Sequence, residues 1–412
     1  CNGAAMSQTR QLIDLELDKG AHNYHPVGVV LTRAKGSFLW DVDGRRYIDM
    51  MGAYSTASLG HCHPKIIKAL VKQAKALDVT SRAFYNDQLP PWLDLLTQLA
   101  GADKALPMNS GAEAVETALK LARKWGETVK GIAKEKCEII GCEGNFHGRT
   151  LGLISLSTDP QYRAHFGPLL PGMKTVPFGD IQALKKAITP RTAAFIVEPI
   201  QGEAGIRVPP AGFLAQAQAL CKQHNVLFIV DEIQCGLARS GRFFCYEHDG
   251  LKPDLVILGK ALGGGVYPVS AVVGRGDVIG VFRPGDHGST FGGNAIAAAV
   301  SMAALKLLSD PALIERADKL GQWALAYLRK HLAGAPVVRD IRGRGLLIGV
   351  EVAPEVGARP LVDELKGHGV LTKDSHEVVI RLAPPLNIKK KHLRQALQAV
   401  TKVVQKARMP VS

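Results

Sequence analysis

The chain has 412 residues, of which 46% are hydrophobic and 21% are charged, a balance that is typical of folded proteins and excludes bulk disorder. At roughly 150 residues per domain, this length predicts two or three structural units. The 51 lysines and arginines exceed the 37 aspartates and glutamates, and the resulting net charge of +14 indicates anionic partners.

The distribution of charged and cysteine residues narrows the classes of partner. Basic residues are interspersed with acidic ones, without the aromatic-interleaved stripe or zinc-finger spacing of nucleic-acid-binding proteins, so we expect small anionic substrates and no nucleic acid. No stretch approaches the roughly 20 apolar residues of a membrane span, so we expect no membrane partner. The seven cysteines contain no CxxC pair, which argues against a disulfide framework or a metal site. Residues 1–6 lack a signal-peptide layout, which predicts a cytoplasmic protein, or a mitochondrial-matrix protein from which a presequence has been removed.

The predicted elements begin with antiparallel hairpins in the alternating residues 28–50, where Asp43-Gly44 supplies a turn. Beyond them, helical patterns alternate with short, nearly unbroken apolar runs. The helical patterns lie at 64–77, 112–124 and 214–224, and the apolar runs at 194–197, 226–230, 255–258 and 269–273. Such runs are typical of strands buried on both faces, so the middle of the chain predicts an α/β domain with a parallel sheet.

The C-terminal region predicts a helix that ends near residue 332 and a Gly-rich strand at 343–349. A final helix has one apolar face, formed by Leu393, Leu397, Val400 and Val404. We expect this region to pack against the N-terminal hairpins. The predicted fold class is α/β: a large domain of residues 51–299 with a mostly parallel central sheet, and a small α+β domain formed by residues 1–50 and 300–412.

Two charged residues follow neighbouring predicted strands. Asp231 comes directly after the run 226–230, and a carboxylate there needs a cationic partner. For an isolated aspartate, a helix cap or a salt-bridged strand end is the better explanation, and the lysine after the next strand is what favours a site. Lys260 follows the run 255–258, at the edge where open α/β sheets bind ligands. A lysine at an apolar pocket has a lowered pKa, and its free amine can attack an aldehyde to form a Schiff base.

A phosphate site is predicted at the start of the helical pattern that follows residue 110. Ser110 and Glu113 fit the S-x-x-E capping box, which leaves the backbone N–H groups of Gly111 and Ala112 free to bind a dianion. By itself this signal is weak, because most capping boxes only begin a helix. The Walker and Rossmann fingerprints are not matched, so nucleotide binding is not supported.

The polar loop 285–294 carries two hydroxyl residues, Ser289 and Thr290, that could complete the same phosphate cup. An aldehyde, a phosphate and a ring nitrogen that faces a carboxylate are together the features of pyridoxal 5′-phosphate. In that arrangement Asp231 would keep the pyridine ring protonated, and Lys260 would hold the aldehyde and then carry the proton. The sequence therefore predicts this cofactor.

Six short segments connect the chain to a known family. They are GHCHP at 60–64, NSGAEA at 109–114, VEPIQGE at 197–203, DEIQ at 231–234, GK at 259–260 and STFGGN at 289–294. With these segments the chain resembles the class III, fold-type I pyridoxal-phosphate aminotransferases over nearly its whole length. The resemblance implies that Phe146 stacks on the cofactor ring, that Gln234 binds its hydroxyl and that Thr290 reaches the phosphate from the neighbouring subunit. It therefore implies a homodimer with shared active sites.

A second set of segments, at 20–26, 80–86, 145–150 and 380–386, is similar to the family members that use L-ornithine. This similarity implies that the terminal amine of ornithine passes to 2-oxoglutarate in a ping-pong cycle that gives glutamate 5-semialdehyde and glutamate. The same similarity also implies roles for five residues.

Tyr24 and Arg149 would hold the distal α-amino acid end of ornithine, and Tyr54 would shape the pocket. Arg381 would bind the α-carboxylate of 2-oxoglutarate with its planar fork. Glu203 would neutralise Arg381 while ornithine is bound and would move aside for the dicarboxylate, because an unpaired arginine in a desolvated site is costly.

Three features depart from the usual ornithine pattern: His147 stands where an aromatic residue is common, Ser110 where threonine is common, and Ala-Ser-Leu at 57–59 where a more polar triplet is common. They leave N-acetylornithine and 4-aminobutyrate as alternative amino donors. A function of another class, a catalytically silent basic interaction protein on the same scaffold, would be indicated by the absence of cofactor absorbance in the purified protein.

Overall fold

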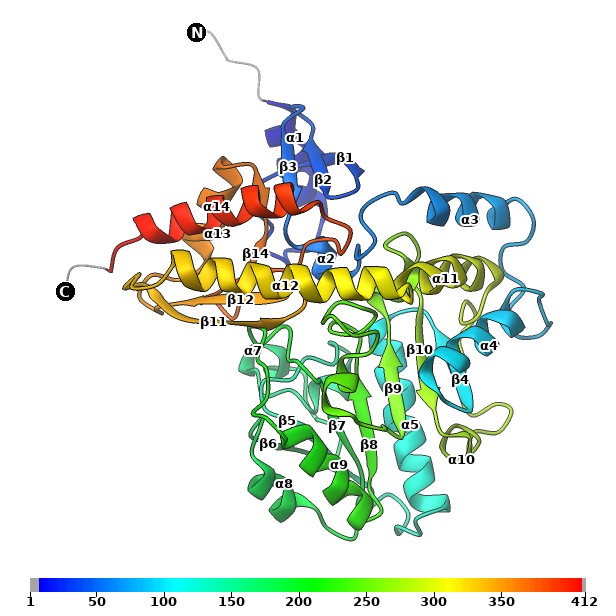
Figure 1. The fold of residues 1–412 in the computed structure, drawn as a ribbon. Helices are drawn as coiled ribbons and strands as arrows, with labels where there is room; N and C mark the ends of the chain where they lie inside the picture. Colours follow the sequence, from blue (N-terminus) through cyan, green and yellow to red (C-terminus); the bar gives the residue numbers. More distant parts are fainter. Residues whose placement is uncertain (1–6, 410–412) are drawn as a thin grey trace.

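The computed structural model describes residues 7–409 (Figure 1). Residues 1–6, in which the sequence shows no signal-peptide layout, and residues 410–412 lie outside the described part. Within it the strands form a seven-stranded central sheet and two four-stranded sheets. The long helix α12 (Pro311–His331) runs across the middle of the molecule, between the central sheet and the terminal segments (Figure 1).

The central sheet has the strand order β4-β10-β9-β8-β7-β5-β6. From β9 to β6 all neighbours are parallel, whereas β10 pairs antiparallel with both β9 and β4. The predicted mostly parallel sheet is confirmed, but the run near 270 is reversed, because an apolar run does not encode strand direction. The strands are β4 (Lys104–Met108), β5 (Glu138–Cys142), β6 (Met173–Val176), β7 (Thr192–Val197), β8 (Leu227–Asp231), β9 (Leu255–Leu258) and β10 (Ser270–Gly274).

Helices cover both faces of this sheet. On β8, Ile229 packs into the apolar cluster under α5 (Gly111–Thr128), whereas Phe228 and Val230 face the larger cluster that contains α9 (Phe213–Gln223). Burial on both faces explains why these strands are continuous apolar runs.

The terminal segments meet in the two smaller sheets, whose strand orders are β1-β2-β3-β13 and β11-β12-β15-β14. β2 and β3 form the predicted hairpin around Asp43-Gly44 (Figure 1). The C-terminal strand β13 pairs parallel with β3. The division into domains at 50/51 and 299/300 stays a prediction. The strands are β1 (Leu31–Lys35), β2 (Phe38–Asp41), β3 (Arg46–Asp49), β11 (Val338–Arg344), β12 (Leu347–Val352), β13 (Val370–Leu371), β14 (Lys373–Ser375) and β15 (Val379–Leu382).

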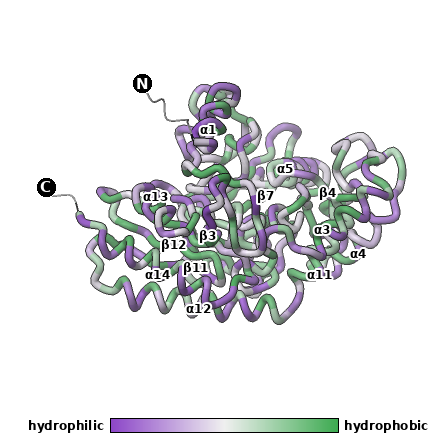
Figure 2. The backbone as a smooth tube through the Cα atoms, turned by 90° about the horizontal axis from the view of Figure 1, so that it is seen from above, coloured by the Kyte–Doolittle hydropathy of each residue, from purple (hydrophilic) through white to green (hydrophobic). Residues whose placement is uncertain are grey.

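The helical patterns correspond to α3 (Pro64–Ala74), α5, α9, α12 and α14 (Lys390–Lys406), and hydrophilic and hydrophobic residues alternate along α12 and α14 (Figure 2). The sequence does not predict α1 (Gln8–Lys19), which buries no residue. No single helix in the described residues is long and apolar enough to cross a membrane; α11 and α12 reach that length and composition only as a pair bent by 62°. The remaining helices are α2 (Gly52–Ser55), α4 (Leu89–Ala100), α6 (Leu151–Ile154), α7 (Pro160–Arg163), α8 (Ile181–Ala187), α10 (Gly276–Ile279), α11 (Ala295–Leu308) and α13 (Arg359–Gly367), with 3-10 turns η1 (Cys245–Asp249) and η2 (Lys260–Gly263).

Candidate active site

A pocket of about 240 Å³ lies at the carboxyl ends of β7, β8 and β9, the edge of the sheet at which ligand sites are expected. Asp231 is the last residue of β8, and Lys260 begins η2 just after β9. Six predicted site residues line the pocket: Gly111, Ala112, Phe146, Asp231, Gln234 and Lys260. They are joined by four that the sequence did not single out as site residues: His147, Gly148, Glu198 and Ile233.

Asp231 is held from two sides at the floor of this pocket. Its Oδ2 lies 2.7 Å from His147 Nδ1, and its Oδ1 accepts the N–H of Ile233 at 3.0 Å. Burial by itself would lower the pKa of His147, but the hydrogen bond and the charge of Asp231 outweigh burial, so this pKa is raised. The departure at position 147 thus supplies a hydrogen-bond partner for the buried carboxylate, and the raised pKa of His147 favours the charged form of its ring.

Lys260 lies in the pocket with a left-handed backbone at φ 46°. Burial lowers the pKa of its ammonium, and the nearby carboxylates of Glu203 and Asp231 offset this only in part. A lowered pKa increases the share of neutral amine, which is the form that attacks carbonyl carbons and accepts protons.

Glu198 is a further carboxylate at this edge, placed directly after β7 as Asp231 is placed at the end of β8. It is buried, and it accepts the N–H groups of Phe146 at 2.9 Å and Gly202 at 3.3 Å. Burial raises its pKa to about 7, although the charge of His147 opposes that rise. Glu198 carries the same sequence signal as Asp231, a carboxylate at the end of an apolar strand.

The predicted capping box is formed at the start of α5. Ser110 Oγ accepts the N–H of Glu113 at 3.2 Å, and the Glu113 carboxylate accepts the N–H of Ser110 at 2.7 Å. The N–H groups of Gly111 and Ala112 have no hydrogen-bond partner among the described residues, and both residues line the pocket. They are therefore available to an anion at the positive end of the helix.

The loop that carries Ser289 and Thr290 is attached to α5 beside the capping box. Ser289 Oγ accepts from Asn109 Nδ2 at 2.7 Å, and the ring of His287 lies 2.7 Å from Thr117 Oγ1. Thr290 is exposed and makes no hydrogen bond within residues 7–409. The structure thus brings Ser289 to the predicted phosphate cup and leaves Thr290 on the surface.

Gln234 connects the pocket to Glu203. Its Nε2 donates to Glu203 Oε1 at 2.9 Å, while its own Oε1 is buried without a partner among the described residues. A Cβ on Gly202 would lie 1.7 Å from Gln234 Oε1, so only glycine leaves room for this side chain.

Glu203 and Arg381 form a two-point ion pair next to the pocket. Nη1 and Nη2 of Arg381 lie 2.9 Å from the two carboxylate oxygens, and the Arg381 side chain is 1% exposed whereas that of Glu203 is 28% exposed. Burial would raise the pKa of Glu203, but Arg381 lowers it to about 2, so the carboxylate stays ionised. The structure therefore contains the pair that the family resemblance implies.

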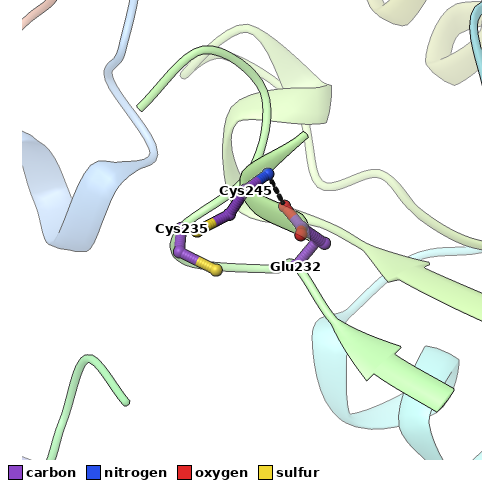
Figure 3. Close-up of side chains that lie close together, drawn as sticks. All are labelled: Glu232, Cys235 and Cys245. Atoms are coloured by element: carbon purple, nitrogen blue, oxygen red, sulfur yellow. Dashed lines mark hydrogen bonds between the residues drawn. The ribbon is translucent and has the colours of Figure 1, made fainter. Parts of the chain in front are cut away.

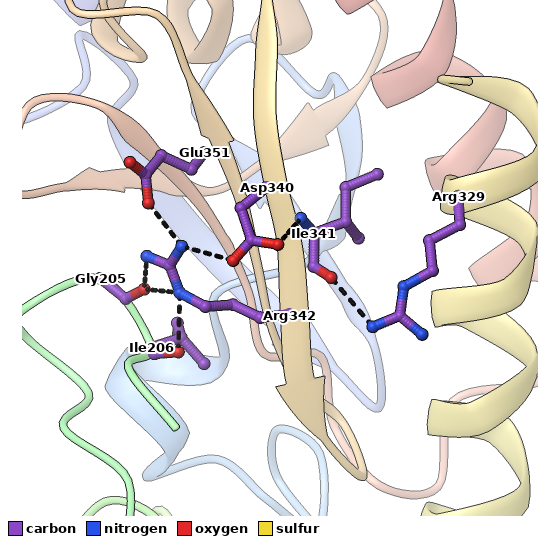
Figure 4. Close-up of polar contacts among 7 residues, drawn as sticks. All are labelled: Gly205, Ile206, Arg329, Asp340, Ile341, Arg342 and Glu351. Carbon is purple, nitrogen blue, oxygen red and sulfur yellow. Dashed lines mark hydrogen bonds and ion pairs between the residues drawn. The ribbon is translucent and has the colours of Figure 1, made fainter. Parts of the chain in front are cut away.

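The backbone that follows Glu203, at Gly205 and Ile206, is held by Arg342 of the C-terminal sheet (Figure 4). Arg342 of β11 donates to the carbonyl of Gly205 through Nε at 3.1 Å and Nη2 at 2.6 Å. Ser375 of β14 donates to the carbonyl of Glu203 at 2.6 Å. A change in the ion pair with Arg381 therefore requires rotation of the Glu203 side chain rather than movement of its loop.

The remaining predicted substrate residues contact one another through arginine side chains that lie over tyrosine rings. Tyr54 lies in the turn Gly52–Ser55, where every φ is positive, a conformation that is strained for side chains other than glycine and is common at functional sites. Arg381 Cζ lies 5.1 Å from the centre of the Tyr54 ring, and Arg149 Cζ lies 5.7 Å from that of Tyr24. The structure thus pairs Tyr54 with Arg381 and Tyr24 with Arg149.

The family model described as "Aminotransferase class-III" matches residues 19–404. The chain belongs to the class III aminotransferases. The resemblance drawn from the six sequence segments is therefore confirmed.

Relatives and solved structures resemble this aminotransferase over nearly its whole length. It is 54% identical to an ornithine aminotransferase of Geobacillus sp. strain WCH70 over 97% of this chain and 99% of that protein. The structure superposes with a TM-score of 0.95 on the ornithine aminotransferase of Toxoplasma gondii ME49, at 43% identity over 97% of this chain and 96% of that one. An acetylornithine aminotransferase of Elizabethkingia anophelis gives a TM-score of 0.88 at 46% identity, over 97% and 99% of the two chains.

Enzymes of this family depend on pyridoxal 5′-phosphate, and the residues of the pocket fit that group. A carboxylate and a lysine face one cavity, and the unpaired N–H groups at the start of α5 suit a phosphate. The buried, unpartnered Oε1 of Gln234 offers an acceptor for a hydroxyl. A Cβ on Gly111 would come within 3.0 Å of Ile233 Cδ1, so the cavity wall is shaped by the absence of a side chain there.

Glu232 of the aminotransferase lies in a buried cluster with Cys235 and Cys245 (Figure 3). The carboxylate and sulfur atoms lie within 4.8 Å of one another. Both carboxylate oxygens already accept backbone N–H groups, from Cys245 at 2.7 Å and from Tyr246 at 2.8 Å. We conclude that Glu232 attaches η1 to the end of β8, behind the residues that line the pocket.

Proposed function

We propose that the aminotransferase transfers the δ-amino group of L-ornithine to 2-oxoglutarate, giving glutamate 5-semialdehyde and glutamate, with pyridoxal 5′-phosphate as cofactor. The observation that carries this proposal is the ion pair of Glu203 and Arg381 beside the pocket of Lys260. The ornithine aminotransferases among the relatives support the same donor.

The ion pair suits a site that must bind two unlike substrates in turn. Ornithine presents an amine with no carboxylate beside the reacting carbon, and during that half of the cycle Glu203 neutralises the buried Arg381, which would otherwise be costly. 2-Oxoglutarate presents a carboxylate beside its keto group. The partly exposed Glu203 side chain can rotate away, and the planar fork of Arg381 can then bind that carboxylate.

The cofactor, when bound, supplies an aldehyde that links to amines and a ring that accepts electrons from the reacting carbon. Lys260 would hold it, Asp231 would face its ring nitrogen, and Phe146 and Gln234 would contact its ring. The phosphate would be held by Ser110, Gly111, Ala112 and Ser289. The lowered pKa of Lys260 suits its Nζ to take a proton from the substrate and to return it.

The proposal includes a homodimer in which Thr290 of the partner subunit completes the phosphate cup. Its support is the exposure of Thr290 together with large exposed aromatic side chains near it in the chain or in space. Phe291 is next to Thr290 and is 49% exposed, and Phe84 (70%) and Tyr85 (96%) precede Asn86, whose Nδ2 donates to the carbonyl of Gly293. Light scattering of the active protein should give twice the monomer mass, and a fully active monomer would contradict this part of the proposal.

Absorbance spectra with single donors test the reaction. The purified protein with pyridoxal 5′-phosphate should be yellow, ornithine alone should bleach it, and 2-oxoglutarate should restore the colour. N-acetylornithine and 4-aminobutyrate are the comparison donors. Bleaching that is faster with either of them than with ornithine would reject the proposed donor, and a colourless, unresponsive protein would reject the proposed function altogether.

A further inference from the structure

We define the mouth of the site as the predicted substrate residues Tyr24, Tyr54, Arg149 and Arg381, together with Lys373 beside them. Neither the sequence nor the family resemblance assigns a role to Lys373. Its Nζ donates to Tyr54 Oη at 3.2 Å. The same Nζ lies 5.9 Å from the ring centres of both Tyr24 and Tyr54. Lys373 is therefore among the residues to which the proposed function assigns substrate contacts.

The register of the C-terminal sheet places Lys373 against Arg381. β14 pairs antiparallel with β15, and the two residues are direct partners in that pairing. Residues opposite one another in an antiparallel pair project on the same face, and two like charges in that position destabilise the sheet. The chain thus keeps two cations side by side at the pocket, an arrangement that needs a reason.

Only one of these two cations is neutralised. Both terminal nitrogens of Arg381 are paired with Glu203. Within residues 7–409 no carboxylate oxygen lies within 4.0 Å of Lys373 Nζ, whose hydrogen-bond partner is the phenol of Tyr54. Arg149 Cζ lies 5.7 Å from the centre of the Tyr24 ring and adds a further positive charge. The mouth therefore has an excess of positive charge that an anionic ligand would neutralise.

We propose that Lys373 binds the distal carboxylate of both substrates and thereby determines specificity for them; this inference rests on the proposed function. When the δ-carbon of ornithine reacts, its carboxylate is at the far end of the molecule. When the keto carbon of 2-oxoglutarate reacts, that acid also presents a carboxylate at its far end. Arg381 takes the near carboxylate, which only the keto acid has, so the far carboxylate needs other cations. Arg149 is the one that the family resemblance implies for ornithine, and Lys373, which lies against the same Tyr24 ring, would be a second.

The choice of lysine over arginine at this position has a physical reason. In 2-oxoglutarate the far carboxylate is one carbon-carbon bond nearer to the reacting carbon than the carboxylate of ornithine is. The cation therefore has to reach a carboxylate at two different distances from the reacting carbon. An ammonium on a flexible four-carbon stem can follow such a change, whereas the rigid fork of a guanidinium suits a fixed position such as that of Arg381.

Truncated substrates separate this role from a structural one. We compare ornithine with 1,4-diaminobutane, which lacks its carboxylate, and 2-oxoglutarate with 2-oxobutanoate, which lacks the far carboxylate. Each half-reaction is followed by absorbance in single turnovers with enzyme in excess, which makes slow substrates measurable. The proteins are wild type, Lys373→Gln, Lys373→Arg and the matched control Lys402→Gln, which removes the same charge from an exposed position of α14.

Lys373→Gln should lower kcat/KM about tenfold to a hundredfold for ornithine and for 2-oxoglutarate, mainly through KM, which is the loss expected when a hydrogen bond to a charged group is removed. The values for the two truncated substrates should not change. Lys373→Arg should retain more activity than Lys373→Gln with 2-oxoglutarate and ornithine, and Lys402→Gln should match wild type throughout. Melting temperatures of all variants verify that they are folded.

Three kinds of result would overturn the inference: equal losses with complete and truncated substrates, a loss confined to ornithine alone or to 2-oxoglutarate alone, or unchanged kinetics of Lys373→Gln. Failure of the proposed function is distinguishable, because it would appear already in the wild-type protein as a spectrum that ornithine does not bleach.

Discussion

The floor of the active site and its mouth are built in different ways. The floor consists of Asp231, Lys260 and Glu198, which stand at the ends of neighbouring strands of one sheet. Hydrogen bonds to nearby backbone and side chains hold the two carboxylates in place. The mouth consists of Tyr24, Tyr54, Arg149, Lys373 and Arg381. These five come from segments distributed over nearly the whole chain, and several of them meet through ring faces. We infer that the floor acts on every substrate alike and that the mouth distinguishes between substrates.

The largest expected effect is at the floor. Lys260→Ala removes the amine that would hold the cofactor and carry the proton, so kcat should fall by roughly 10⁴-fold or more, and equally for every donor. Trapping with borohydride should leave no cofactor attached to the variant. Lys402→Ala serves as the control because its side chain is exposed on α14. Near-normal turnover by Lys260→Ala would contradict the assignment of the floor.

A smaller loss is expected for Asp231→Asn, which keeps the shape of the side chain and removes its charge. Without the carboxylate, nothing holds a proton on the cofactor ring, and we expect a loss of roughly 10²–10⁴-fold in the proton-transfer step. The pKa of His147 should also fall, because Asp231 is the partner that raises it. The deuterium isotope effect on single turnovers measures the first change, and the NMR titration of the imidazole measures the second. A small loss of rate whose size differs between donors would mean that Asp231 takes part in distinguishing substrates, as the mouth residues do.

The floor is the part that the sequence predicts well, and local signals are the reason. Asp231 and Lys260 each follow an apolar strand, and Ser110 stands in a capping box, so every one of these residues is marked by its immediate neighbours. Glu198 carries the same signal after β7 and is missed only because the strand-end argument is applied to two strands rather than to all of them. Strand direction is not encoded in this way, which is why the reversal of β10 is found only in the structure.

The mouth is predicted only in part, because its geometry comes from tertiary register. Lys373 lies beside the other site residues because the pairing of β14 with β15 places it opposite Arg381. Arg342 holds the loop that follows Glu203 by donating to the carbonyl of Gly205, and these residues are far apart in the sequence. Neither Lys373 nor Arg342 belongs to a motif. The left-handed turn at Tyr54 is also hidden, because only its first residue, Gly52, is a glycine. What the sequence does predict of the mouth rests on family resemblance.

Glu203→Ala tests the boundary between floor and mouth. The substitution leaves Arg381 free to bind a carboxylate next to the reacting amine, so the preference for ornithine over glutamate as donor should shift toward glutamate by roughly tenfold to a hundredfold. The pKa of Glu203 is about 2, so Glu203 stays ionised and paired with Arg381 in the wild type until the pH falls to about that value. The donor preference of the wild type should therefore be constant at and above neutral pH. The ratio of kcat/KM for the two donors measures both expectations. Glu355→Ala is the control, as it removes an exposed carboxylate, and an unchanged ratio in Glu203→Ala would contradict the exchange of partners at Arg381.

The smallest effect on catalysis is expected behind the floor, at Glu232, where the effect should be on stability instead. Burial raises the pKa of Glu232 to about 8, so its contribution to stability is complete below the ordinary carboxyl pKa and is lost as pH rises toward 8. Each unit of such a shift corresponds to about 1.4 kcal/mol. Glu232→Gln cannot ionise, although its amide can accept only one of the two N–H groups that the carboxylate accepts, so it should be less stable at low pH.

The melting temperature of the wild type should therefore fall relative to that of Glu232→Gln as pH rises from about 5 to 8, with kcat little changed at neutral pH. Both proteins are measured with saturating cofactor, so that cofactor loss does not produce the difference, and Glu355→Gln should follow the wild type at every pH. A constant difference between Glu232→Gln and the wild type would mean that the two backbone N–H groups keep Glu232 ionised, in which case hydrogen bonding outweighs burial in this cluster. A large loss of kcat would instead place Glu232 with Asp231 in the floor.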